Sequence, residues 1–359
     1  MPAETILPAH VTQPAKTTLP AHAAPISLDR WLRETWPSRR QRLVATVCLG
    51  TAMSLAMVGL ATAARRSGLG LVAGLEASSV PKVLPRSLPY GKGMWIWQPE
   101  KTESNDADAI VARAADVGLT HLYVRTGSSW DGFYAGDFLD RILPAAHAAG
   151  IRVYGWDFPR LISATDDVSR AAAAVEYRTP TGHHLDGFAA DIETPAEGTA
   201  LSAEAAAAYG AGLREAVGPA VPLVAVVPRP SAWMATLGYP YSEVVAHFDA
   251  VAPMVYWLDR EPGSDVAGAL AYLRGYGKPV FPVGQAYDGG PEGGRPGVPP
   301  RAELLRFFEV SYDHGAEGVS FWVWQGADQQ AFDSIRDAPE FRASVAGSGT
   351  LGRFDLSRR

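Results

Sequence analysis

The chain has 359 residues, of which 47% are hydrophobic and 19% charged, and its formal net charge at pH 7 is −6. This composition is that of a globular protein and excludes a wholly disordered chain. The negative charge argues against a nucleic-acid partner. The single cysteine, Cys48, excludes an intramolecular disulfide and a cysteine-based metal site.

Residues 1–42 are predicted to be a disordered, basic segment. Residues 1–27 are rich in Pro, Ala and Thr and show no apolar period. Residues 1–66 contain eight Lys and Arg against three acidic residues, so they carry +5 and the rest of the chain carries −11. A short basic segment of this kind is typical of a targeting signal rather than of a ligand surface.

Residues 43–64 form a run of 22 residues without a charge, which is long enough to cross a bilayer once. Five arginines precede the run within residues 30–42, and two follow it directly. The positive-inside rule therefore predicts a single-pass anchor, with residues 1–42 in the cytoplasm and the rest of the chain outside. The alternative is an export signal cleaved near residues 61–63, which would leave the protein secreted.

Residues 65–90 are rich in Gly, Ser and Pro and are predicted to be a linker, whereas residues 343–359 are predicted to be a flexible tail. Between them, over residues 91–342, short apolar runs alternate with amphipathic stretches rich in Ala and Leu. The predicted strands are 94–98, 121–126, 152–158, 187–194, 223–228, 250–257, 280–286 and 319–325. The predicted helices are 106–117, 136–149, 165–177, 202–217, 241–248, 264–275, 300–314 and 329–338.

Eight strand–helix units over about 250 residues predict a (β/α)8 TIM barrel of the α/β class. The strands are almost continuously apolar, as expected of parallel strands that are covered on both faces. Gly118 and Gly150 are expected to end helices, and Ser202 to begin one. The alternative, a doubly wound sheet, often has a glycine-rich phosphate turn after its first strand. Here the first strand is followed by Trp97-Gln98-Pro99 instead.

In a TIM barrel the chemistry lies at the C-terminal ends of the strands. Several of these ends carry tryptophan together with Asp, Gln or Arg. Indole faces suit the CH-rich faces of sugar rings, and the polar side chains suit sugar hydroxyls. For any single tryptophan the alternative is that it caps the barrel core. The predicted substrate-binding residues are Trp97, Arg125, Trp156, Asp157, Trp257, Gln285, Trp322 and Trp324.

The fourth predicted strand carries the most specific signal, because Asp191 and Glu193 lie two residues apart. Side chains alternate along a strand, so both carboxyl groups point to the same face. Two carboxyl groups this close cannot both ionise freely, and one of them is expected to stay protonated near neutral pH. Glu193 lies farther along the strand and is predicted to be a general acid, with Asp191 modulating its proton. The structural alternative is two ordinary acids at a strand exit.

These motifs resemble the barrel glycoside hydrolases, and in particular the family 18 chitinase-like group. That group has the pattern Asp-Gly-x-Asp-x-Asp-x-Glu on its fourth strand, which residues 186–193 follow in part, and Met-x-Tyr on its sixth, which residues 254–256 match. Its eighth strand ends in Trp, here Trp322 or Trp324. The resemblance implies that Glu193 is the acid, that Asp191 assists it, and that Tyr256 supports a substrate acetamido group.

Two positions depart from that pattern: Ala189 replaces its innermost Asp, and Trp257 follows Tyr256 where the family usually has Asp. The seventh strand ends in Gln285 rather than in a carboxylate nucleophile. Either an N-acetyl group of the substrate acts as the nucleophile, or another acid such as Asp157 or Asp259 does.

The sequence therefore predicts a glycoside hydrolase that acts on extracellular or cell-wall polysaccharide, without a cofactor or a metal. The glycine-rich segment 288–294 is interpreted as a mobile loop at the cleft. One alternative is a non-catalytic carbohydrate-binding barrel anchored at the cell envelope. Another is a scaffold that the membrane segment recruits to an envelope complex.

Overall fold

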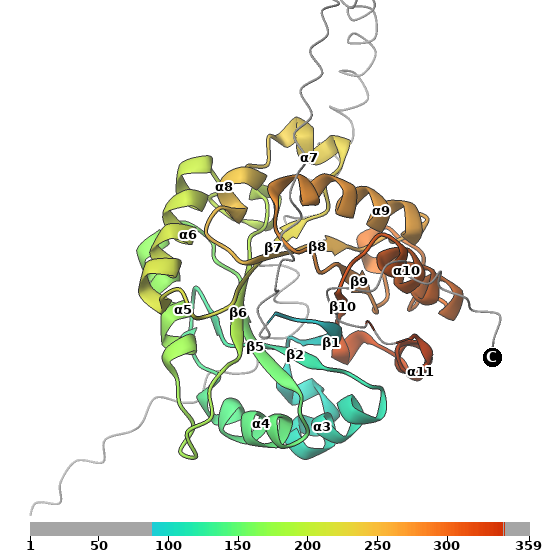
Figure 1. Cartoon of the computed structure of the whole chain (residues 1–359), viewed down its shortest axis with the longest axis horizontal. Helices are drawn as coiled ribbons and strands as arrows, with labels where there is room; N and C mark the ends of the chain where they lie inside the picture. The colour runs from blue at the N-terminus through green and yellow to red at the C-terminus, as the bar shows by residue number, and fades with distance from the viewer. Residues whose placement is uncertain (1–87, 340, 342–359) are drawn as a thin grey trace, which may run out of the picture. The chain divides into compact units, whose positions relative to one another are not determined.

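The computed structural model describes residues 88–339 and 341, and eight parallel strands form a closed barrel in this part of the chain. The strands follow the order β1-β10-β9-β8-β7-β6-β5-β2, and β1 pairs with β10 to close the barrel (Figure 1). All eight predicted strands are present, so the predicted barrel is confirmed. Their bounds are β1 Gly91–Ile96, β2 His121–Arg125, β5 Arg152–Asp157, β6 Gly187–Asp191, β7 Leu223–Pro228, β8 Ala250–Val255, β9 Val283–Gln285 and β10 Gly318–Trp322.

Helices connect successive strands and surround the barrel (Figure 1). Those that were predicted are α3 Ala107–Asp116, α4 Gly136–Ala148, α5 Ala164–Glu176, α6 Ala203–Val217, α8 Tyr241–Val245, α9 Pro262–Leu273, α10 Arg301–Asp313 and α11 Gln329–Asp337. Several short elements were not predicted, because they are too short to show a period. They are the hairpin of β3 (Gly127–Ser128) with β4 (Gly132–Phe133), α7 (Ala232–Leu237) and the 3-10 helices η1 to η6 of three residues each.

Local signals place the helix ends where the sequence predicts them. The Ser202 hydroxyl accepts a hydrogen bond from the backbone N–H of Ala205 at 3.1 Å and so caps α6. Gly118 and Gly150 follow α3 and α4 with φ angles of 69° and 73°. This left-handed conformation suits glycine, and it ends each helix so that the next strand can begin.

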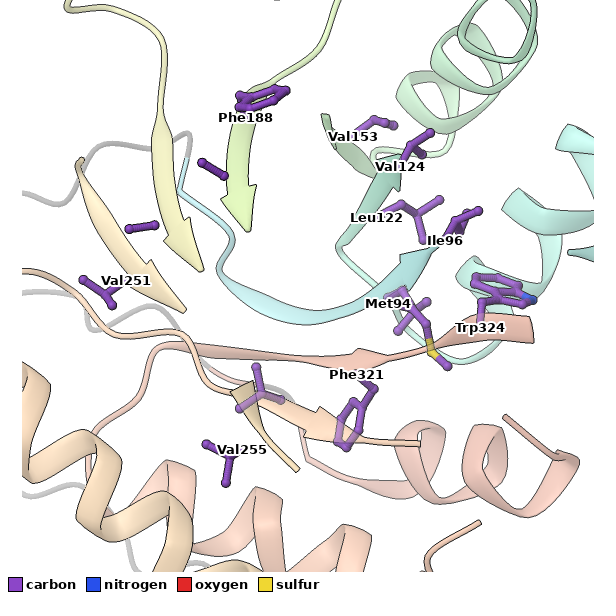
Figure 2. Close-up of a cluster of buried hydrophobic side chains, with 14 of the residues drawn as sticks. Met94, Ile96, Leu122, Val124, Val153, Phe188, Val251, Val255, Phe321 and Trp324 are labelled. Carbon is purple, nitrogen blue, oxygen red and sulfur yellow. The ribbon is translucent and has the colours of Figure 1, made fainter. Parts of the chain in front are cut away.

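Alternation along the strands divides the apolar residues into two layers. The outward-facing side chains pack against the surrounding helices, among them Ile96, Leu122, Val124 and Phe321 (Figure 2). These side chains are fully buried and form the main hydrophobic core of the described residues. Most of the apolar burial therefore lies between the sheet and the helices, as is usual for this fold.

Aromatic rings fill the barrel interior. Trp95 and Tyr123 stack with ring centroids 3.9 Å apart, and Tyr154 lies 5.3 Å from Tyr123. Gly93 is required beside them, because a Cβ there would lie 2.0 Å from Nε2 of His121. Burial lowers the pKa of His121 to about 3, so its ring is neutral inside the barrel.

The predicted segments 1–42 and 43–64, most of the linker at 65–90 and the tail at 343–359 lie outside the described residues. Within residues 88–339, no helix combines the length and the apolar character that a membrane span requires.

Lys92 links the first strand, β1, to the last helix, α11. Substitution of Lys92 tests how much this link stabilises the fold. The buried ammonium donates hydrogen bonds to the carbonyls of Ile335 at 2.8 Å and Ala338 at 3.1 Å, at the C-terminal end of α11. We expect Lys92→Met to lower the free energy of unfolding by about 2 kcal/mol, because these charge-assisted bonds are lost. Urea denaturation measures the change. The exposed Lys101→Met is the control, and an equal effect of both substitutions would contradict the prediction.

Candidate functional site

Three of the predicted site residues lie at the C-terminal ends of β6 and β8, which flank β7 at the mouth of the barrel. Asp191 is the last residue of β6, Glu193 follows it by two residues, and Tyr256 directly follows β8. All three side chains are half-buried. The alternation that turns Ile192 outward into the hydrophobic core turns its two acidic neighbours inward.

Glu193 has the properties of a proton donor. Burial raises the pKa of its carboxyl group well above the usual value, and the negative charges of Asp191, Glu197 and Glu292 raise it further. A carboxyl group in this environment keeps its proton near neutral pH, which is the condition that general acid catalysis requires.

Asp191 is the second acid of the site. Burial raises its pKa to about 7, the charge of Arg125 lowers it, and the charges of Asp157 and Glu197 raise it. One carboxyl oxygen, Oδ1, is buried and has no hydrogen-bond partner within the described chain. A buried acceptor without a partner is costly unless a bound molecule satisfies it. Asp191 can therefore accept a hydrogen bond from a ligand.

Tyr256 supplies a hydroxyl group from the end of β8, two strands away from β6. Its ring meets that of Tyr287 edge to face, with centroids 5.6 Å apart. Burial raises the pKa of Tyr256 well above its usual value, and the charges of Asp191 and Glu193 contribute. The Tyr287 hydroxyl donates a hydrogen bond to Glu292 at 2.7 Å, which joins the loop after β9 to the site. Tyr256 therefore stays protonated and can act as a hydrogen-bond donor.

Four tryptophans on or directly after β1, β5 and β10 form one cluster of rings. Trp322 lies 5.3 Å from Trp156 and 6.4 Å from Trp97, and Trp95 lies below them in the interior. Trp156 donates a hydrogen bond to the carbonyl of Ile96 at 3.2 Å. Trp97 and Trp156 are buried in the cluster, whereas Trp322 is half-buried. Trp322 is thus the member with the most surface available for stacking.

Arg125 also belongs to this side of the mouth. Its guanidinium lies 5.6 Å from the ring of Trp156, and Nε donates a hydrogen bond to the carbonyl of Gly127 at 3.3 Å. Its charge acts on Asp191, as that residue's pKa shows. Arg125 is therefore close enough to Asp191 to act on its charge, and its role in substrate binding stays a prediction.

Two predicted stacking residues are corrected, because their rings are buried away from the mouth. Trp257 is 0% exposed, stacks on Phe307 of α10, and donates to Glu303 at 2.8 Å. Trp324 packs on Phe332 of α11 within the outer core (Figure 2). Trp257 follows the outward alternation of β8, and Trp324 lies in a turn beyond β10. Neither ring has a face on which a sugar could stack.

Asp157 and Gln285 have internal partners instead of a place in the cleft. Asp157 points out of the barrel, and Arg170 of α5 donates to it at 2.6 Å. Gln285 lies inside the barrel, but its amide accepts from the N–H of Leu258 and donates to the carbonyl of Tyr287. Both are buried, so the expectation of direct sugar contact is corrected for them too.

Sequence reasoning missed Glu197 and Glu292, which add negative charge around Glu193. Each ends a 3-10 helix of three residues, η3 (Pro195–Glu197) and η5 (Gly290–Glu292), and no strand period assigns a direction to a side chain there. In the described part of the chain, no group of three or more His, Cys, Asp or Glu residues is arranged to hold a metal ion.

No family model matches the chain, and no curated protein matches it. Several solved structures share its fold. An endo-1,4-β-mannanase from Rhizomucor miehei is 9% identical with a TM-score of 0.51, over 65% of this chain and 86% of its own. The C-terminal domain of a candidate chitinase from Desulfitobacterium hafniense is 13% identical with a TM-score of 0.50, over 69% and 99%. A candidate α-L-fucosidase from Bacteroides thetaiotaomicron is 12% identical with a TM-score of 0.51, over 75% and 98%. At these identities the likeness concerns the fold.

Because the carboxylate of Asp191 has a buried oxygen without a partner, we expect its replacement by an amide to increase the free energy of unfolding. The folded-state pKa of about 7 lies above the unfolded value of about 3.9, so ionisation opposes folding as the pH rises between them. We expect Asp191→Asn to raise the free energy of unfolding by about 4 kcal/mol at pH 8 and to change it little near pH 4. Denaturation at both pH values measures this. The exposed Asp259→Asn is the control, and a loss of stability at pH 8 in Asp191→Asn would contradict the prediction.

Proposed function

We propose that this protein is a glycoside hydrolase in which Glu193 is the general acid and Asp191 assists. The observation that carries the proposal is the pair of half-buried carboxyl groups of Asp191 and Glu193 at the barrel mouth, where burial and neighbouring negative charge raise the pKa of Glu193. Retention of a proton on one of two neighbouring carboxyl groups is the arrangement that glycosidic bond cleavage uses. The solved structures that share the fold carry names of enzymes that act on glycans, which is consistent with this proposal.

In the proposed reaction, Glu193 gives its proton to the glycosidic oxygen as the bond to C1 breaks. The acetamido oxygen of the same sugar attacks C1 and forms a cyclic oxazolinium, so no enzyme nucleophile is required. Asp191 accepts a hydrogen bond from the acetamido N–H, and Tyr256 donates one to the acetamido oxygen. Glu193, now ionised, then takes a proton from the water that opens the ring at C1.

The positions of other acids favour this route over an enzyme nucleophile. Asp157 lies behind the barrel wall on Arg170, and Asp259 is an exposed residue beyond Tyr256. The seventh strand of the barrel, β9, ends in Gln285, which is bonded to two backbone groups. The substrate class that fits is a polysaccharide containing N-acetylhexosamine, of the extracellular or cell-wall type.

A second candidate function is carbohydrate binding without hydrolysis. The observation that favours it is Ala189, which is fully buried in the barrel interior beside Trp156. In the resembled motif this position holds a third carboxyl group, which would act on Asp191. A barrel that lacks this group could keep the tryptophan cluster for binding while its chemistry is lost.

A proposal about the location of the protein rests on the sequence. We propose that residues 43–64 anchor the chain in a membrane with the barrel outside the cytoplasm, because the run carries no charge and is preceded by five arginines. The alternative remains secretion after cleavage. Fractionation of cells that express the full chain, with the size of the product, distinguishes the two.

Glu193→Gln tests the proposed acid. The amide matches the carboxyl group in shape but cannot donate the proton, so we expect kcat to fall by about 10² to 10⁴ fold. Release of reducing sugar from chitin oligomers, peptidoglycan and mannan measures the change. Glu215→Gln, on the exposed surface of α6, is the matched control. Full hydrolysis by Glu193→Gln would overturn the proposal, and binding without release by the wild type would select the second candidate.

The coupling between the two acids predicts a shift in the pH profile. The negative charge of Asp191 raises the pKa of Glu193, so its removal lowers that pKa. Residual activity of Asp191→Asn is therefore expected to disappear at lower pH than that of the wild type. The basic limb of kcat/KM measures this. Glu197→Gln should move the limb in the same direction by less, because Glu197 contributes less than Asp191. A limb that stays in place in both variants would contradict the assignment.

A further inference from the structure

Trp130 is a large apolar side chain that the fold presents to solvent. Its indole is 69% exposed at the tip of the β3–β4 hairpin, which follows β2 at the same end of the barrel as the acids. Single exposed apolar residues are common, and exposure by itself does not indicate a ligand. The contacts that hold Trp130 in place, and the arginine next to it, are what suggest a binding site.

The hairpin holds Trp130 in a defined position. The Ser128 hydroxyl donates a hydrogen bond to Asp131 at 2.7 Å and accepts one from the N–H of Trp130 at 3.3 Å. At the hairpin base, a Cβ on Gly127 would lie 2.9 Å from Cδ of Arg170, so the backbone packs directly on that side chain. Arg170 is itself fixed by ion pairs with two buried aspartates. These contacts hold the hairpin in place with the ring of Trp130 exposed to solvent.

Arg160 connects this ring to the candidate active site. Its guanidinium lies 5.4 Å from the ring centroid of Trp130 and 5.5 Å from that of Phe158. On its other side it lies against Gly198, where a Cβ would be 2.7 Å from Nη1. Gly198 directly follows Glu197, whose charge acts on Glu193. Trp130, Arg160 and the loop after β6 thus form one continuous stretch of the rim that ends beside the acid.

We propose that Trp130 and Arg160 form a distal subsite that binds a sugar unit of a polysaccharide chain several units away from the bond at Glu193. The inference rests on the proposed function and extends it to a chain substrate. A flat ring suits the apolar face of a sugar, and guanidinium N–H groups suit its hydroxyls. The polar neighbours Ser128, Ser129 and Asp131 fit a glycan better than a protein, whose interface would need a broad apolar centre.

A length series with the full chain tests the subsite. The probes are N-acetylglucosamine oligomers and mannose oligomers of two to six units, and glycol chitin and galactomannan in affinity electrophoresis. All binding is measured in Glu193→Gln, so that hydrolysis does not remove the probe. In the Glu193→Gln parent, which retains Trp130, the affinity for oligomers should rise with their length. When Trp130→Ala is added, the affinity should no longer rise with length, and polymer binding should weaken about tenfold, or by about 1.4 kcal/mol.

Two further variants separate stacking from general damage. Trp130→Phe keeps a flat ring and should retain most of the rise in affinity with chain length. Tyr272→Ala removes an aromatic side chain that is 51% exposed on α9, away from the mouth, and should bind every probe as the parent does. Thermal unfolding of each variant checks that the barrel is intact.

Failure of the subsite and failure of the proposed function give different results. Equal polymer binding by Trp130→Ala and its parent would overturn the subsite and leave the acid at Glu193 untouched. Full hydrolysis by Glu193→Gln with a length effect that depends on Trp130 would overturn the acid and support the subsite. If no probe binds to any variant, the subsite for these glycans is overturned.

Discussion

Alternation of side chains in the closed barrel is the constraint on which the rest of the structure depends. Eight parallel strands with helices around them leave one environment inside and another outside, and each strand residue enters one of the two. Ile192 and Trp257 enter the outer layer, whereas Asp191 and Tyr256 face inward. A shift of one residue in β6 would exchange the candidate acids for buried apolar groups.

The barrel interior becomes polar only near the mouth, and this change from apolar to polar surroundings determines the pKa values of the acids there. Below, stacked rings such as Trp95 and Tyr123 exclude water from the barrel. At the mouth, Asp191 and Glu193 are desolvated by that packing and repel each other, so their pKa values rise. A buried carboxylate without a partner lowers the free energy of unfolding. Such a loss of stability is typical of residues that serve ligand binding rather than folding.

A buried ion cluster behind the wall supports the rim. Arg170 contacts Asp157 at the end of β5 and Asp167 on its own helix, and Asp167 accepts the N–H of Leu161 in the loop above. Removal of one partner would leave an uncompensated buried charge, which is usually severe. The same cluster packs against Gly127, so the loops after β2 and β5 share one anchor. The loops at this end of the barrel are thereby held by charged groups buried behind the barrel wall.

The amino-acid sequence by itself determined the strand and helix order, the barrel, and the pair at Asp191 and Glu193, because hydrophobic period and helix caps are local properties. It could not decide which side chains near the strand ends enter the barrel mouth, because that depends on what packs against each strand end in the folded chain. Trp257 and Trp324 therefore looked like cleft residues but are core residues, and Asp157 looked like a ligand contact but holds Arg170. Only the tertiary structure decided these positions, since the partner of each side chain lies on a helix that packs against the outside of the barrel.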